Sequence, residues 1–176
     1  RHNVGIMENL IDGLLTLSRM GRQELTREWT DPGPLVNEVV SELLEQVPER
    51  RIAVSIRELP PCFADPSMLR QVYTNLIGNA IKFTRHTRDP SIDIGAVKSG
   101  TGTVYHVRDN GIGFDMAYAD RIFKPFQRLH SREEYEGSGI GLATVERIIR
   151  RHGGRIWAEG KPGEGGAFYF TIEGGP

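Results

Sequence analysis

The chain has a single cysteine, Cys62, among its 176 residues. One thiol cannot form an internal disulfide, and this usage is typical of a reducing compartment. The flanking segment PPCFAD suggests no metal or redox site, so we interpret Cys62 as a small buried residue.

Charge of one sign and long apolar runs are also lacking. The 22 Lys and Arg residues nearly balance the 23 Asp and Glu residues, which leaves a net charge of −1. This balance favours neither nucleic acid nor an anionic membrane as a partner. No apolar run approaches the roughly 20 residues that span a bilayer, and no signal-like N-terminus is present. We therefore expect a soluble, cytoplasmic segment that makes no membrane contact.

An apolar stripe runs through the first 20 residues. Met7, Leu10, Leu14 and Leu17 recur at spacings of three and four, which predicts one face of a helix. Further apolar residues widen the stripe towards that of a multi-helix bundle. We expect this helix to pack on a second copy of the chain or on a helix outside the sequence.

The remainder of the chain has the pattern of an α+β domain. Asp31-Pro32 and Asp65-Pro66 each combine an N-cap residue with a proline suited to the first turn, and they predict two helix starts. A third helix is predicted at 142–151. Strands are predicted at 25–30, 51–58, 91–99, 103–109, 155–160 and 167–173. The helices segregate from a mostly antiparallel set of strands, which predicts a two-layer sandwich of one sheet and three helices.

Four short motifs follow one another along this domain. They are NLIGNAIKFT (75–84), DNGIGF (109–114), RIFKPFQR (121–128) and GSGIGLATV (137–145), and the glycine-rich segment GEGGAFYF (163–170) follows them. Each is weak evidence alone, but together and in this order they describe an ATP pocket.

The first motif places three polar side chains on one helix face. Asn75, Asn79 and Lys82 stand at i, i+4 and i+7, while their apolar neighbours point into the core. Two amides and an ammonium suit a polyphosphate with hydrated Mg²⁺, which accepts few protein ligands. The alternative is that the two amides cap or bridge neighbouring backbone.

The second and fourth motifs supply a carboxylate and glycine turns. Asp109 ends a strand and can accept a hydrogen bond from an amino group such as that of adenine, although a plain D-N-G turn is the alternative. Gly137, Gly139 and Gly141 precede a helix, where exposed backbone N–H groups bind anions. A flexible linker is the alternative for these glycines.

The segment between Phe126 and Gly137 is polar and short of apolar anchors. We interpret it as a mobile lid, whose Arg128, His130 and Arg132 could reach phosphate oxygens. A solvated loop is the alternative for these three side chains. We expect Phe123 and Phe126 to anchor the base of the lid to the core.

Together the motifs resemble the N, G1, F and G2 boxes of the catalytic, ATP-binding domain of sensor histidine kinases, and GEGGAFYF resembles the trailing G3 segment. The resemblance implies a Bergerat-type fold, a mixed sheet backed by three helices, with ATP held between the helices and under a lid. It also implies a division into residues 29–174 as the catalytic domain and residues 1–28 as part of the second helix of a dimerisation hairpin.

The resemblance further implies roles for individual residues. Asn79 is the Mg²⁺-binding amide, and Asn75, Lys82 and Arg128 are the catalytic candidates near the phosphates. Asp109 takes the adenine amine. The other residues implied to bind ATP are Phe83, Gly111, Ile112, Gly113, Gly137, Ser138, Gly139, Ile140, Gly141 and Leu142.

One residue separates the alternatives within this superfamily. The gyrase and heat-shock chaperone ATPases have a glutamate at the position of Asn75, where it activates the attacking water. An amide cannot act as that general base. Asn75 therefore favours phosphoryl transfer to a side chain over ATP hydrolysis.

The sequence departs from the kinase pattern in having no H-box, the segment that carries the phospho-acceptor histidine. His2 lacks the H-box context, and we interpret His86, His106 and His152 as surface or strand residues. We expect the acceptor on a helix outside this sequence, the full-length protein to be a homodimer, and a response-regulator receiver domain as partner. The rival functions are a nucleotide-binding regulatory module without transfer activity and an anti-sigma-type serine kinase or chaperone-like ATPase.

Overall fold

The computed structural model describes residues 24–100, 102–127, 135 and 137–174. The helix predicted within residues 1–23 lies outside these ranges, as do Arg128, His130 and Arg132 of the predicted lid.

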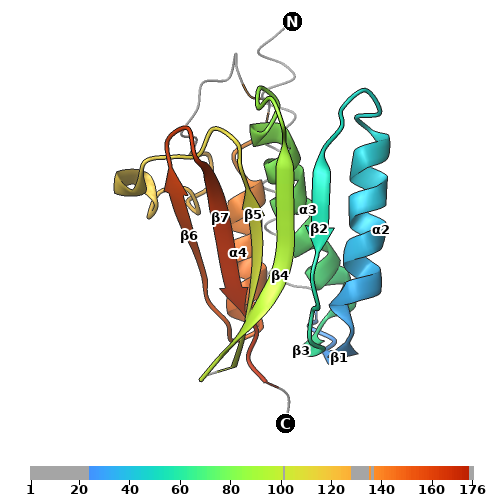
Figure 1. Ribbon diagram of the computed structural model, residues 1–176. Helices are drawn as coiled ribbons and strands as arrows, with labels where there is room; N and C mark the ends of the chain where they lie inside the picture. Colours follow the sequence, from blue (N-terminus) through green and yellow to red (C-terminus); the bar gives the residue numbers. More distant parts are fainter. Residues whose placement is uncertain (1–23, 101, 128–134, 136, 175–176) are drawn as a thin grey trace, which may run out of the picture.

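A five-stranded mixed sheet is covered by helices on one face (Figure 1). Its order is β2-β4-β5-β7-β6, in which β2 and β4 pair in parallel and the other neighbours are antiparallel. The strands are β2 (Ala53–Ile56), β4 (Ser91–Ser99), β5 (Gly102–Asp109), β6 (Ile156–Lys161) and β7 (Gly165–Thr171). The predicted α+β sandwich with a mostly antiparallel sheet is confirmed.

Two short strands form a separate sheet near the N-terminal end of the described chain. β1 (Glu28–Thr30) pairs antiparallel with β3 (Cys62–Ala64). The sequence pattern did not predict β3, because its three residues are too few for a period of two to be recognised. Cys62 is buried as expected, and burial raises the pKa of its thiol to about 11.

The helical layer consists of α2 (Pro32–Glu45), α3 (Pro66–Phe83) and α4 (Gly141–Arg151), and a 3₁₀ turn, η1, spans Met116–Tyr118. Asp31 and Asp65 are the N-caps of α2 and α3, each followed by proline, so both predicted helix starts are confirmed. No helix in the described part of the chain is both long and apolar enough to cross a membrane.

Helix α3 has two different faces. Its buried face packs against the sheet and the flanking helices through Met68, Leu69, Val72, Tyr73, Leu76, Ile77, Ala80 and Ile81. Burial of one Leu or Ile contributes about 1.5–3 kcal/mol, so this face fixes the rotation of the helix about its axis. The opposite face is thereby free to carry polar groups.

Asp65 joins three parts of the chain at the start of α3. Its Oδ1 accepts the N–H groups of Ser67 (3.0 Å) and Met68 (3.1 Å), and its Oδ2 accepts that of Thr26 (3.1 Å). Its own N–H donates to Nε2 of His152 at the end of α4 (3.0 Å). Burial opposes ionisation, but the hydrogen bonds outweigh it and hold the pKa of this carboxyl below its ordinary value.

His152 differs from its prediction as a surface or strand residue. It is the C-cap of α4 and only 1% exposed, with Nδ1–H donating to the carbonyl of Ile148 at 2.8 Å. Burial lowers the pKa of the imidazole, which keeps Nε2 available as an acceptor. This burial could not be predicted from local pattern, because the partner, Asp65, lies far away along the chain. His106 does lie in a strand, β5.

The other end of α3 is held by a guanidinium. Arg50 donates to the carbonyl of Ile81 (2.5 Å) and to the hydroxyl of the buried Thr84 (3.1 Å), which caps the helix. A cation at a helix C-terminus also interacts favourably with the helix dipole. Both ends of α3 are therefore fixed by hydrogen bonds to other segments.

Replacing Asp65 by alanine is expected to destabilise the protein more than replacing Asp31, the N-cap of α2. Asp31 accepts one backbone N–H, from Gly33, so its loss should cost about 1 kcal/mol. Asp65→Ala also leaves the Thr26 N–H without its acceptor, so we expect a loss of about 2–3 kcal/mol. Urea unfolding of both variants at neutral pH measures the difference.

The same pair gives a pH test. The pKa of Asp65 is lower in the folded than in the unfolded state. Its contribution to the free energy of unfolding is therefore complete above the unfolded pKa and is lost as the pH falls through the folded pKa. The gap between the two variants should therefore narrow in acid. Equal losses at every pH would contradict a joining role for Asp65.

Candidate functional site

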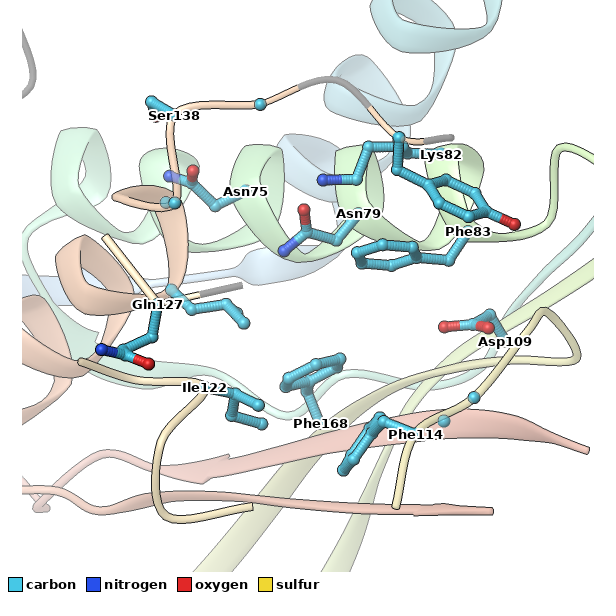
Figure 2. A pocket seen from close by; sticks show the side chains of 17 residues that line it. Asn75, Asn79, Lys82, Phe83, Asp109, Phe114, Ile122, Gln127, Ser138 and Phe168 are labelled. Atoms are coloured by element: carbon cyan, nitrogen blue, oxygen red, sulfur yellow. The ribbon is translucent and has the colours of Figure 1, made fainter. Parts of the chain in front are cut away.

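A cavity of about 260 Å³ lies between α3, the start of α4 and the sheet (Figure 2). Its lining includes most of the residues predicted from the motifs: Asn75, Asn79, Lys82, Phe83, Asp109, Gly113, Gly137, Ser138, Gly139, Gly141 and Leu142. Gly111, Ile112 and Ile140 do not line it, and Arg128 lies outside the described residues.

The polar face of α3 forms one wall. Figure 2 shows Asn75, Asn79 and Lys82 following one another along the helix on the cavity side. Asn75 donates to the carbonyl of Gln71 (2.9 Å), as in the alternative in which the amide bridges backbone. The side chain of Asn79 makes no hydrogen bond to any described residue, so its amide is available to a ligand.

Asp109 is the carboxylate of the cavity and only 7% exposed. Burial raises its pKa to about 6, although hydrogen bonds from the backbone N–H groups of Gly111 and Gly166 act in the opposite direction. The Gly111 N–H donates to its Oδ1 at 2.8 Å. A buried carboxylate held in this way is a strong acceptor for a ligand amino group.

The turn after Asp109 is held by backbone contacts. Ile112 N–H donates to the carbonyl of Phe83 (3.1 Å), and a Cβ on Gly111 would collide with that same oxygen. Gly113 has φ +64°, and a Cβ there would collide with the carbonyl of Lys161. Gly111 and Ile112 therefore fix the position of Asp109 relative to α3 and do not line the cavity themselves.

The start of α4 presents backbone N–H groups without a side-chain cap. Its N-cap is Ile140, whose side chain makes no capping hydrogen bond. A Cβ on Gly141 would lie 2.5 Å from Oδ1 of Asn75, so glycine lets α4 approach α3 closely. An uncapped helix start beside two amides and an ammonium is suited to an anion such as a phosphate group.

Of the two aromatic residues predicted to anchor the base of the lid, one packs on the core and the other does not. Phe123 packs edge-on against Phe168, with ring centroids 6.4 Å apart, as expected of an anchor. Phe126 is 42% exposed with φ +64°, so its prediction as an anchor was wrong. Its N–H donates to the carbonyl of Gly139 (2.9 Å), and this backbone contact leaves the ring outside the core.

Sequence reasoning missed six lining residues: Phe114, Ile122, Gln127, Tyr135, Gly166 and Phe168. Phe114 and Phe168 stand inside quoted motifs, where their apolar character was a usable signal. Tyr135 corrects the description of residues 127–136 as short of apolar anchors, because it is buried and its ring lies 5.4 Å from that of Phe83. A lone aromatic in a polar segment was the available signal.

The polar groups fit a nucleotide with Mg²⁺. The described residues hold no cluster of three or more His, Cys, Asp or Glu that could bind a metal alone. One amide, Asn79, fits Mg²⁺, which keeps waters and takes its remaining ligands from substrate phosphates. Figure 2 shows Asp109 and Ser138 towards opposite ends of the cavity, so an amino group and a phosphate chain have separate places.

Comparisons with known proteins agree with this geometry. Residues 64–175 match the family model described as histidine kinase-, DNA gyrase B- and HSP90-like ATPase. Cyanobacterial phytochrome A of Nostoc sp. is 42% identical over 169 residues, which are 96% of this chain and 22% of the relative. The methanogenesis regulatory histidine kinase FilI of Methanothrix harundinacea is 38% identical over 94% of this chain and 19% of its own length. The chain thus spans about a fifth of these relatives.

Solved structures give the same answer. Full-length ShkA in complex with AMPPNP matches with a TM-score of 0.76 and 28% identity, over 94% of this chain and 36% of that one. The catalytic domain of histidine kinase ThkA matches with a TM-score of 0.69 and 28% identity, over 85% of this chain and 95% of that domain.

Asp109→Asn is expected to stabilise the ligand-free protein at neutral pH. Asparagine keeps an oxygen for the Gly111 N–H but has no charge to bury. The folded pKa, about 6, exceeds the ordinary value of 3.8, so the wild type loses stability as the pH rises between these values. The difference between variant and wild type should grow to about 2–3 kcal/mol by pH 7 and vanish below pH ~4.

Unfolding by urea at several pH values, without ligand, measures this difference. A variant less stable than the wild type at pH 7 would show that the Asp109 carboxylate is stabilised by its surroundings and not strained by burial.

Proposed function

Since the chain belongs to the histidine kinase-, DNA gyrase B- and HSP90-like ATPase family, and within it is a catalytic domain of the histidine kinase type, we propose that it binds Mg²⁺-ATP and transfers the γ-phosphoryl group to a histidine. The acceptor histidine belongs to a dimerisation hairpin, and the helix predicted within residues 1–28 supplies part of its second helix, although Glu28 itself lies in β1. Residues 29–174 form the catalytic domain in this proposal.

One observation carries the proposal: a single cavity joins a buried carboxylate to the polar face of α3 and to the uncapped start of α4. Asp109 accepts the adenine amine at one end. The backbone at Gly137, Gly139 and Gly141 holds the phosphates at the other, with Ser138, Ile140 and Leu142 completing that segment. Gly111, Ile112 and Gly113 shape the turn at the base, and Phe83 supplies an apolar surface.

The catalytic work of the chain is positioning and charge neutralisation, as expected for a loose phosphoryl-transfer transition state. Asn79 holds Mg²⁺, which when bound neutralises phosphate charge. Asn75 and Lys82 orient the phosphate chain from α3, and we propose that Arg128 adds a guanidinium. In the transfer, a bond forms between phosphorus and an imidazole nitrogen, the bond to the bridging oxygen breaks, and ADP leaves.

The lining favours transfer over hydrolysis. Among the described residues that line the cavity, Asp109 is the only carboxylate, and it lies at the opposite end from Ser138 (Figure 2). The position that would have to activate a water carries the amide of Asn75, and an amide is no general base. None of the described lining residues is therefore placed to activate a water against the phosphoryl group, which favours a nucleophile from outside the cavity.

The proposal includes partners. A histidine kinase domain works with a hairpin that supplies the histidine and with a response-regulator receiver domain that takes the phosphoryl group from it. The apolar stripe of Met7, Leu10, Leu14 and Leu17 fits helix packing in such a hairpin, so we propose a homodimer for the full-length protein.

Mg²⁺-dependent nucleotide binding is the first expected outcome. Calorimetric titration with a non-hydrolysable ATP analogue should give one-site binding that a chelator abolishes. Asn79→Ala should weaken binding about tenfold or more, because the metal loses its amide ligand. Asn37→Ala is the matched control, since Asn37 is an exposed amide on α2 that donates to Gly33 and should leave binding unchanged. Equal binding by all three proteins would contradict the role of Asn79.

Transfer to histidine is the second expected outcome. The chain is incubated with γ-labelled ATP and a histidine kinase acceptor hairpin supplied in trans, with Lys82→Ala as the inactive comparison. Acid-labile label on the hairpin histidine supports the proposal. Label on serine would favour the serine-kinase alternative, and binding without label would favour a regulatory module that only reads nucleotide occupancy.

A further inference from the structure

Tyr135 is a buried aromatic residue for which the motifs assign no role. It is 4% exposed although the residues around it, from Ser131 to Glu136, are polar or charged. Its ring lies 5.4 Å from that of Phe83 and 6.0 Å from that of His86, so it is packed on the last turn of α3 and the residues after it. It also lines the cavity.

Phe83 and Tyr135 form one continuous wall of the cavity. Their ring planes are inclined at 54°, with centroids 5.4 Å apart. A base stacked between two rings needs a centroid separation of about 7 Å, so no base fits between these two. A base can instead lie along the wall that they share.

The side of the cavity facing this wall is apolar. Figure 2 shows Phe114 and Phe168 across the cavity from Phe83, with the Asp109 carboxylate towards one end. The aromatic wall, the facing phenylalanines and the terminal acceptor together make a slot for a flat ring that carries an amino group. Phosphate groups gain nothing from this slot, because its surfaces are apolar and its charge is negative.

We propose that Tyr135 is a base-recognition residue, whose ring provides part of the stacking surface for adenine. The inference rests on the proposed nucleotide-binding function and adds to it a specific division of labour. Tyr135 acts on the base alone, whereas Asn79, Lys82 and the start of α4 act on the phosphates and the metal. Stacking on an aromatic side chain stabilises a bound base appreciably, and any aromatic ring of similar shape can provide it.

The experiment separates the base from the phosphates. Affinities of the whole chain for Mg²⁺-ATP analogue and for Mg²⁺-tripolyphosphate, which has no base, are each measured by direct calorimetric titration. Tyr135→Ala should weaken binding of the ATP analogue about tenfold and leave the affinity for tripolyphosphate within about twofold of the wild-type value. Tyr135→Phe should restore the wild-type affinity, because it keeps the ring.

The matched control is Tyr118→Ala. Tyr118 is 45% exposed, lies in η1 and does not line the cavity, so both affinities should be unchanged. Thermal unfolding of each variant checks that the fold is intact, and Tyr135→Leu, which keeps apolar volume but has no ring to stack, supplies the test if Tyr135→Ala does not fold.

Each result decides between distinct conclusions. Selective loss of the ATP analogue, rescued by phenylalanine, supports base recognition. Parallel loss of both ligands would overturn it, because that is the effect of an anchor for the neighbouring segment. Unchanged ATP binding in Tyr135→Ala would overturn the proposal as well. Tighter ATP binding in that variant would also overturn it, because it would show that the ring obstructs the base. A wild type that binds tripolyphosphate but no ATP analogue, or neither, would overturn the proposed function itself.

Discussion

The site depends on the placement of one helix, α3, which must bury one face while presenting amides and an ammonium on the other. Rotation about its axis is fixed by the apolar face against the sheet, since turning the helix would expose Leu76 and Ile77 and bury Lys82. Translation along the axis is fixed at the two ends, by Asp65 and by Arg50. With both motions removed, the spacing of Asn75, Asn79 and Lys82 becomes a fixed template for a ligand.

Helix α4 is positioned by α3 at two points. Its last residues meet the start of α3 through the hydrogen bond between Asp65 and His152, and its first residue, Gly141, lies against Asn75. The two helices therefore run antiparallel, and the uncapped start of α4 opens into the cavity. Capping it would stabilise the helix by about 1 kcal/mol but would occupy the N–H groups that an anion needs. Asp109 presents the same conflict, because burial there opposes the negative charge that the proposed recognition of an amino group would use.

Local sequence signals predicted much of this arrangement. Asp31-Pro32 and Asp65-Pro66 predicted two helix starts. The motifs identified Asn75, Asn79, Asp109 and the glycines before α4, all of which line the cavity. Features set by distant partners were not predictable. Burial of His152 depends on Asp65, the exposure of Phe126 depends on Gly139, and the buried position of Tyr135 depends on Phe83. In each case the deciding contact joins segments that no local period connects.

The cavity is assembled from widely separated parts of the chain, and its lining extends from Asn75 to Phe168. The turn after Asp109 is itself wedged between Phe83 and the strand pair β6–β7, where a Cβ on Gly165 would collide with the Asp109 carbonyl. During synthesis on the ribosome, the side of the slot that carries Phe168 cannot be completed until β7 has emerged and paired with β5. Nucleotide therefore cannot act as a template for the early folding of the nascent domain. Nucleotide can bind, and so stabilise, the domain only after β7 is in place. ATP is therefore a ligand of the completely folded domain alone.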